Sequence, residues 1–583
     1  GYPTEAVELL TPVAETAPDD FEVQMMLGDA LMRSGRNEES KKVLERAARI
    51  APTRTGALSQ LAMLRIVAGQ DSAAMANLED ALKRDPEATQ LAVMLSLAHL
   101  RRGENEAALK TARLVAEREP KNPIAHNLMA GAYLGMKNVE AARRSLAAAI
   151  AANPRYKEAI GNLAKLELSV GNFDEAYALN EKILAMEPLN GQVMMNLAEI
   201  DQRRGRGEDA IRWLLKARAI SRDREAASMR LVGAYIGAQQ YDNAIRAAEG
   251  LQAQDPQNIR YIAALGRAYL AAKQLAKAAS VFTELSTRAA ERKSATWVHR
   301  AGLWQERARD FDGARRSYLD ALEIDPAFLP AQVELFRLDL GARDYESALA
   351  RAERVSAVQP DTVLGQSMRA DVFMQQGRYE EAARIYAAAF ERQPDDKLAV
   401  RTYRAKREAH LADALAFAER WAGQRPDDPA AQRLLASAYT DHGKRTEAIG
   451  IYEKLLTANS RDAALLNNLA GLYAPVDGQK ALEMARRAAD AAPNSPAVLD
   501  TYGWILVQQG NMSEGLSLLR NAHLRAPNVP DIRYHMAVAL HALGRLDDAE
   551  RELRAALESG MRFAGEQDAR RLLDRVTDRA ESR

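Results

Sequence analysis

The sequence predicts an all-α fold, a right-handed superhelical solenoid of antiparallel helix pairs with about sixteen full repeats of 34 residues. Three observations predict it. Prolines recur at intervals of 34 residues, and small residues recur at two fixed distances from these prolines. Between these markers the apolar residues follow helical spacing, so each repeat contains two amphipathic helices.

One whole repeat can be followed from Pro493 to Pro527. Its first helix is expected over residues 498–508, where the apolar side chains share one face. Gly510 ends that helix, because glycine takes the left-handed conformation without a Cβ penalty. The second helix starts near Ser513, an N-cap candidate. Two such short helices bury too little apolar surface alone, so each pair must stack on the next pair.

The register continues along the chain with few slips. Pro256 and Pro326 are 70 residues apart, two more than two repeats, and the surplus lies around Arg292. Pro426 follows Pro394 after only 32 residues. Arg222 and Ser460 stand where a proline is due, and the other closing prolines are Pro18, Pro52, Pro86, Pro120, Pro154, Pro188, Pro360, Pro493 and Pro527.

Two positions in each repeat carry small residues, as a close crossing of two helices requires. Twelve residues before the closing position stand Ala6, Ser40, Ala74, Ala108, Ala142, Ala176, Ala210, Ala244, Ala278, Ala314, Ala348, Ala382, Ala414, Ala448, Ala481, Gly515 and Ala549. Ten residues after it stand Gly28, Ala62, Ser96, Ala130, Ala164, Ala198, Gly266, Gly302, Ala370, Ala436, Ala470, Gly503 and Ala537. Val232, Phe336 and Arg404 are exceptions, and Arg404 predicts disturbed packing near residues 400–414.

This pattern resembles the tetratricopeptide repeat, a helix-turn-helix with small residues at two crossing sites and a proline near the end of the second helix. We expect a continuous array over residues 19–560, irregular near 285–300 and 400–414. Residues 1–18 are expected to be the second helix of a truncated first repeat, and residues 561–583 a C-terminal capping helix. Because an exposed apolar cross-section is unfavourable, we expect that native sequence has been removed upstream.

Composition excludes several classes of function. Lys plus Arg and Asp plus Glu each total 80, so the formal net charge is zero. A general attraction to nucleic acid is therefore not supported. The chain has no cysteine, which excludes disulfides and thiol catalysis. No apolar run approaches the length needed to cross a bilayer, so no membrane-spanning segment is expected.

The motifs of catalysis and cofactor binding are missing from the sequence. There is no GxxxxGK phosphate loop and no HExxH metal motif. The eight histidines are scattered, and His535 and His541 are placed on different sides of one helix by their spacing. We therefore expect a protein that is not an enzyme and has no catalytic residues, cofactor or metal site.

The resemblance places partner binding on the inner face of the first helices. In the middle repeats this face carries five arginines, Arg230, Arg260, Arg267, Arg300 and Arg337. They predict a basic stripe that grips an acidic peptide or an anionic polymer such as a polysaccharide. The alternative is that they are solvated arginines interleaved with acidic residues such as Glu199, Glu334 and Asp371.

Four further residues are candidates for the same groove. Asn162, Asn196 and Asn468 each precede a Leu-Ala pair, as asparagines do in peptide-binding members of the family. Trp504 directly follows Gly503 and is either exposed on the groove or packed in the core. The partners expected are peptide segments of other proteins or subunits of a larger complex.

Residues 465–557, with the runs NNLA, YGWIL and IRYHMAVAL, resemble the C-terminal part of the PrsT family. These are tetratricopeptide lipoproteins of exosortase and PEP-CTERM exopolysaccharide loci. The resemblance implies a scaffold of the bacterial cell envelope, periplasmic and lipid-anchored to the outer membrane through an upstream region. Such a scaffold would assist exopolysaccharide assembly or export, or the sorting of PEP-CTERM surface proteins.

Two alternatives stay open. The chain could be the periplasmic array of a cellulose, alginate or poly-N-acetylglucosamine export system, although its expected C-terminal cap counts against a fused barrel. It could also be the repeat region of a larger enzyme such as a glycosyltransferase.

Overall fold

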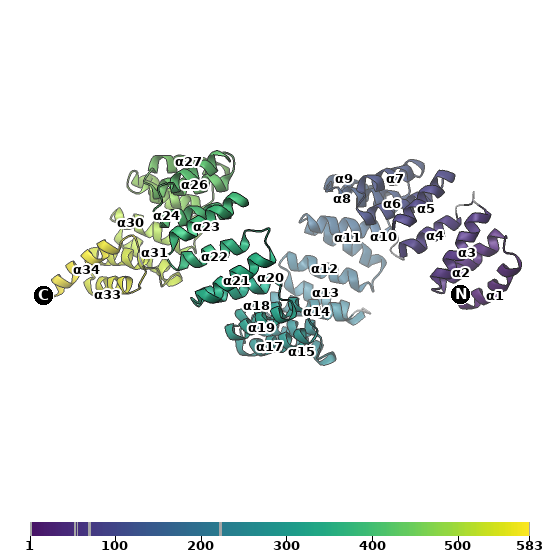
Figure 1. Cartoon of the computed structure of the whole chain (residues 1–583), viewed down its shortest axis with the longest axis horizontal. Coiled ribbons are helices and arrows are strands. Elements are labelled where there is room, and N and C mark those ends of the chain that lie inside the picture. The colour runs from purple at the N-terminus through teal and green to yellow at the C-terminus, as the bar shows by residue number, and fades with distance from the viewer. Residues whose placement is uncertain are drawn as a thin grey trace. The chain divides into compact units, whose positions relative to one another are not determined.

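The computed structural model describes residues 3–51, 54, 56–67, 71–220, 224–561 and 563–581. Pro52 and Arg222, two of the repeat markers, lie outside these residues. Within the described ranges the regular elements are 34 helices and no strand (Figure 1). The predicted all-α solenoid of helix pairs is confirmed.

The first helices of the repeats carry the even labels from α2 to α32. Their bounds are α2 Phe21–Arg33, α4 Gly56–Val67, α6 Thr89–Arg102, α8 Pro123–Gly135, α10 Lys157–Ser169, α12 Gly191–Arg203, α14 Arg224–Gly237, α16 Ile259–Ala271, α18 Ala295–Arg307, α20 Leu329–Gly341, α22 Leu364–Gln375, α24 Asp396–Glu408, α26 Pro429–Asp441, α28 Ala463–Tyr473, α30 Pro496–Gln508 and α32 Pro530–Ala542.

The second helices carry the odd labels, and one further helix follows them. Their bounds are α1 Pro3–Thr16, α3 Asn37–Ile50, α5 Asp71–Arg84, α7 Asn105–Arg118, α9 Val139–Ala152, α11 Phe173–Met186, α13 Gly207–Ile220, α15 Tyr241–Gln254, α17 Leu275–Glu291, α19 Phe311–Ile324, α21 Tyr345–Val358, α23 Tyr379–Arg392, α25 Ala414–Gly423, α27 Arg445–Ala458, α29 Gly478–Ala491, α31 Met512–Arg525, α33 Leu546–Leu557 and the last helix α34 Glu566–Glu581.

The chain forms two compact units, Gly1–Asp320 and Ala321–Arg583, with the boundary inside α19. Within each unit, helices that follow one another in the chain pack side by side (Figure 1). The core is therefore a series of small clusters rather than one centre. One cluster joins α8 to α12 through residues such as Leu146 and Ile160, and another joins α26 to α30.

The predicted small residues do lie at the helix crossings. Twelve residues before the closing positions every small residue except Ala6 is buried, and ten residues after them all are buried. At the crossing of α30 and α31, a Cβ added to Gly503 would lie 2.9 Å from the carbonyl oxygen of Gly515. A Cβ on Gly515 would lie 2.7 Å from the carbonyl oxygen of Gly503. Any larger residue would push these two backbones apart.

Where serine replaces alanine at a crossing, its hydroxyl finds an acceptor on the opposite helix. Ser40 Oγ donates to the carbonyl oxygen of Gly28 over 2.7 Å, and Ser96 Oγ donates to that of Ala108 over 2.9 Å. Buried hydroxyls need such partners, so serine fits the crossing without an unsatisfied polar group.

The helices at the two predicted irregular places differ in length from their equivalents. Helix α17 has 17 residues where most second helices have 14, so it absorbs residues of the surplus that precedes Arg292. Helix α25 has only 10 residues. Insertions and deletions are thus taken up by second helices and by the turns beside them.

The deletion of two residues after Pro394 explains why Arg404 breaks the small-residue rule. Thr402, two residues earlier, is fully buried, and Ala405 is fully buried as well. Thr402 Oγ1 donates to the carbonyl oxygen of Leu398 over 2.8 Å. Thr402 therefore occupies the small site of α24, and Arg404 lies exposed on the helix surface.

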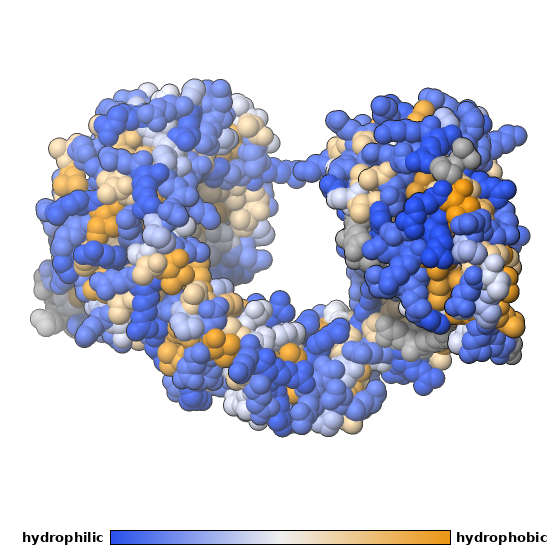
Figure 2. All heavy atoms as spheres, turned by 45° about the vertical axis from the view of Figure 1, so that its right-hand side comes forward, coloured by the Kyte–Doolittle hydropathy of each residue, from blue (hydrophilic) through white to orange (hydrophobic). Residues whose placement is uncertain are grey.

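The last helix covers the end of the second unit. On α34 the side chains of Ala569, Leu572 and Val576 are buried against Ala537 and Leu553 of α32 and α33. Figure 2 shows that the face in view is mostly hydrophilic, with hydrophobic residues in small separate groups. None of the described helices combines the length and the hydrophobicity needed to span a membrane.

Candidate functional site

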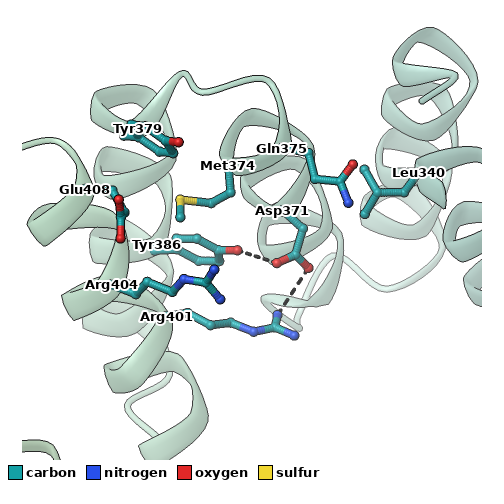
Figure 3. Close-up of a pocket in the computed structure, with 9 residues that line it drawn as sticks. All are labelled: Leu340, Asp371, Met374, Gln375, Tyr379, Tyr386, Arg401, Arg404 and Glu408. Carbon is teal, nitrogen blue, oxygen red and sulfur yellow. Dashed lines mark hydrogen bonds and ion pairs between the residues drawn. The ribbon is translucent and has the colours of Figure 1, made fainter. Parts of the chain in front are cut away.

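A pocket of about 490 Å³ lies in the second unit, between the first helices α20, α22 and α24 and the second helix α23 (Figure 3). Asp371 directly follows the small residue Ala370, which is the register position of Arg267 and Arg337. The pocket therefore lies on the face where the sequence predicts partner binding. Its lining consists of Leu340, Asp371, Met374, Gln375, Tyr379, Tyr386, Arg401, Arg404 and Glu408.

Asp371, one of the two acids that line the pocket, is held by two neighbours. The hydroxyl of Tyr386 donates to Oδ1 of Asp371, and Nη1 of Arg401 lies 3.4 Å from Oδ2 (Figure 3). Tyr386 is 1% exposed, which makes it one of the largest fully buried side chains. A buried tyrosine needs a partner for its hydroxyl, so Tyr386 and Asp371 stabilise each other.

Burial also sets the protonation of this pair. Burial raises the pKa of the Asp371 carboxyl, and the hydrogen bond from Tyr386 and the charge of Arg401 partly offset it. The pKa of the Tyr386 phenol is raised as well, first by burial and then by the charge of Asp371. Since an ordinary tyrosine already titrates near 10, Tyr386 keeps its proton at neutral pH and remains a donor.

Arg404 differs from the other charged residues of the pocket. Glu408 is paired with Arg407, and Asp371 is paired with Arg401. Arg404 is exposed at the pocket, and it makes no hydrogen bond or ion pair with any residue of the described ranges. In Figure 3 it lies beside the hydroxyl of Tyr386, with no interaction drawn to it. Arg404 is thus the charged residue of the pocket lining that forms no ion pair within the described residues, and its guanidinium is free to donate to an anionic group.

The structure gives four of the five predicted groove arginines neighbours within the protein. Arg230 Nη1 donates to the carbonyl oxygen of Met195 over 3.3 Å, and Arg260 lies 3.7 Å from Glu225. The guanidinium of Arg300 lies 5.1 Å from the ring centre of Trp297, and Arg337 Nε lies 2.9 Å from Glu334. Arg267 is exposed. Arg337 belongs to the second unit and the others to the first.

The three predicted asparagines also contact neighbouring side chains. Asn162 Nδ2 donates to Asn127 over 2.9 Å, and Asn196 Nδ2 lies 3.4 Å from Asn180 Oδ1. Asn468 Nδ2 lies 3.3 Å from the hydroxyl of Tyr452. Asn162 connects the first helices of two successive repeats, whereas Asn196 and Asn468 each connect a first helix to the second helix before it. The amide oxygen of Asn196 also accepts from Gln192 over 3.0 Å, so both polar atoms of Asn196 have partners within the protein.

Trp504 is half-buried between repeats. Its ring stacks on His535 with a centroid distance of 4.2 Å and an angle of 15°. His535 Nδ1 lies 2.8 Å from Asp500 Oδ1. The structure thus places the indole in an aromatic contact between α30 and α32.

The described residues include no cluster of side chains that could form a metal site. Over the ranges that the structure describes, no three His, Cys, Asp or Glu side chains gather closely enough to hold an ion.

Sequence reasoning missed this pocket as a site, although two of its residues carry a signal. Asp371 is noticed only as an acid interleaved with the arginines, and Arg404 only as an exception to the small-residue rule. A long charged residue at the position where counting from Pro394 predicts a small one is the signal that could have drawn attention to this repeat.

Three family models match the chain, and all three describe the tetratricopeptide repeat. One family model matches residues 1–64, 67–132, 167–232 and 506–562. A second matches residues 127–183 and 333–397, and a third matches residues 433–464. Together they cover more than half of the chain. No curated protein matches it.

Three solved structures that resemble the chain share little of its sequence. Yeast Tom70 is 14% identical with a TM-score of 0.37, covering 74% of this chain and 96% of that one. The APC/C hetero-tetramer Cut9-Hcn1 is 13% identical with a TM-score of 0.35, covering 97% and 98%. A tetratricopeptide repeat protein from Parabacteroides merdae is 18% identical with a TM-score of 0.34, covering 39% and 91%. Identity this low indicates nothing about a shared partner.

Proposed function

The chain belongs to the tetratricopeptide repeat family, and on that premise we propose that it is a non-catalytic scaffold whose pocket at Asp371 binds a partner protein. Repeats of this family imply protein interaction. The observation that carries the proposal is the exposed Arg404, a cation without an internal partner among the described residues. The guanidinium of Arg404 is therefore available to a ligand, whereas the other charged residues of the pocket are held by ion pairs within the protein.

The place of action in this proposal is the bacterial cell envelope. The support is the resemblance of residues 465–557 to the PrsT lipoproteins. On this proposal the scaffold is periplasmic and lipid-anchored. It would assist exopolysaccharide assembly or export, or the sorting of PEP-CTERM surface proteins. The groove arginines of the first unit, Arg230, Arg260, Arg267 and Arg300, offer a second surface, whose partner would be a protein or an anionic polysaccharide.

A pull-down from bacterial envelopes tests the pocket. Wild type is compared with Arg404→Met, which removes the charge and keeps a long side chain. We expect that a specific partner captured by wild type is reduced about tenfold or more by this change, because a charge-assisted contact contributes about 1.5–3 kcal/mol.

The matched control is Arg354→Met, which removes an exposed arginine from α21 of the same unit. It should capture the partner as wild type does. A quadruple change of Arg230, Arg267, Arg300 and Arg337 to glutamate examines the basic stripe separately. If wild type and Arg404→Met captured the partner equally, the pocket would not be the binding site.

A further inference from the structure

We propose that the pocket at Asp371 takes a carboxylate side chain from an acidic segment of the partner protein, with Arg404 as the main donor and Arg401 as the second. This inference rests on the proposed function and adds the chemistry of the partner. It follows from the charges of the pocket, the geometry of its ion pair and the nature of its walls.

The first step is the pairing of the charged residues that line the pocket. Four charged residues line the pocket, and two of them, Asp371 and Glu408, already have cationic partners. Of the two arginines, Arg401 is paired with Asp371, and Arg404 forms no ion pair within the described residues. A guanidinium keeps its proton at every physiological pH, and its planar fork matches a carboxylate through two parallel hydrogen bonds. The complementary ligand group is therefore a carboxylate.

The second step concerns Arg401. Its Nη1 lies 3.4 Å from Asp371 Oδ2, longer than the 2.7–2.9 Å of a strong charge-assisted hydrogen bond. The side chain of Arg401 is 48% exposed. Asp371 would keep its hydrogen bond from Tyr386 if Arg401 turned away. Arg401 and Arg404 are three residues apart on α24 and share one face, so both can reach the same ligand group.

The third step is the choice of a peptide over a sugar acid. Leu340, Met374 and the ring of Tyr379 line the same pocket, and they offer apolar contact to the methylene groups of a glutamate side chain (Figure 3). Gln375 carries an amide that can donate to and accept from a peptide group. A pocket of about 490 Å³ holds a side chain together with the backbone beside it. An acidic segment of a protein uses all of these features.

The probes are three fluorescein-labelled pools of random decapeptides, with the central residue fixed as glutamate, glutamine or lysine. Binding to the full chain is measured by fluorescence anisotropy. We expect the glutamate pool to bind about tenfold tighter than the glutamine pool, and the lysine pool to bind least. Arg404→Met should abolish this preference, Arg404→Lys should keep part of it, and Arg354→Met should leave it unchanged.

Asp371→Asn should change the affinity for the glutamate pool in the opposite direction to Arg404→Met. Asparagine still accepts from Tyr386 but no longer holds Arg401, so the glutamate pool should bind tighter than to wild type. If Asp371 were merely structural, the change would weaken binding instead. Circular dichroism of each variant checks that it is folded.

Three results would overturn the inference. Equal binding of the glutamate and glutamine pools would show that the ligand is not a carboxylate, while the pocket stays the binding site. If no pocket variant altered peptide binding, the pocket would be ruled out as the binding site, and the proposed function would be refuted as well. Binding of an oligomer of galacturonic acid through Arg404, without binding of any peptide pool, would make the partner a polysaccharide.

Discussion

Phe282→Ala should lower the free energy of unfolding of the first unit by about 3–5 kcal/mol. Phe282 on α17 is fully buried, and its ring packs on Gly266 of α16, where an added Cβ would lie 2.3 Å from it. The ring also stacks on Trp304 of α18 with a centroid distance of 5.4 Å. Truncation of the ring therefore leaves a cavity between α16, α17 and α18. Gly266 cannot fill this cavity because it has no side chain.

Urea denaturation followed by circular dichroism measures this loss. Because each repeat of a solenoid contacts only its neighbours, hydrogen exchange should rise first in α16, α17 and α18. The matched control is Phe311→Ala, since Phe311 is 54% exposed, and its effect should stay within about 0.5 kcal/mol. Equal losses for the two phenylalanines would contradict the packing account.

Arg143→Met should cost the first unit about 3 kcal/mol at neutral pH, because it leaves a buried carboxylate without its cation. The side chain of Glu167 is 4% exposed, and Arg143 Nε donates to its Oε1 over 2.6 Å. Asn172 Nδ2 donates to the other oxygen over 2.6 Å and would remain. The control is Arg144→Met, which removes the adjacent exposed arginine and should be nearly neutral.

The same variant should show a defined pH dependence. The hydrogen bond from Arg143, assisted by Asn172, holds the pKa of Glu167 below its usual value, against the effect of burial. A lowered pKa means that this stabilisation is present above the unfolded pKa of about 4.3 and is lost as the pH falls through the folded pKa. The difference between wild type and Arg143→Met should therefore be largest near pH 7 and shrink in acid. A difference independent of pH would refute the ion pair as its source.

The repeat and its crossings can be predicted from sequence because they depend on one residue at a fixed period. Gly503 and Gly515 illustrate this, since each lies where the other's backbone leaves no room for a side chain. The alanines at equivalent positions are buried for the same reason. Gly510, expected to end its helix, has a φ of 89°. Such steric demands are local to one crossing and repeat along the chain.

The pocket could not be predicted in the same way, because it depends on which charges meet in space. The sequence places Asp371 and Arg401 thirty residues apart and says nothing of Tyr386 between them. It marks Arg404 as an exception, but the burial of Thr402 shows that the helix has shifted its packing face. Likewise the register identifies Arg260 and Arg337 but not the carboxylates beside them.

Hydrogen exchange of the full chain, with and without a tight-binding peptide selected from the glutamate pool, tests the central claim that the pocket at Asp371 is the binding site. The account predicts protection of α22, α23 and α24, over residues 364–408. This protection should be missing in Arg404→Met and present in Arg354→Met. Protection of the first helices that carry Arg230, Arg267 and Arg300, with no change over residues 364–408, would contradict the account.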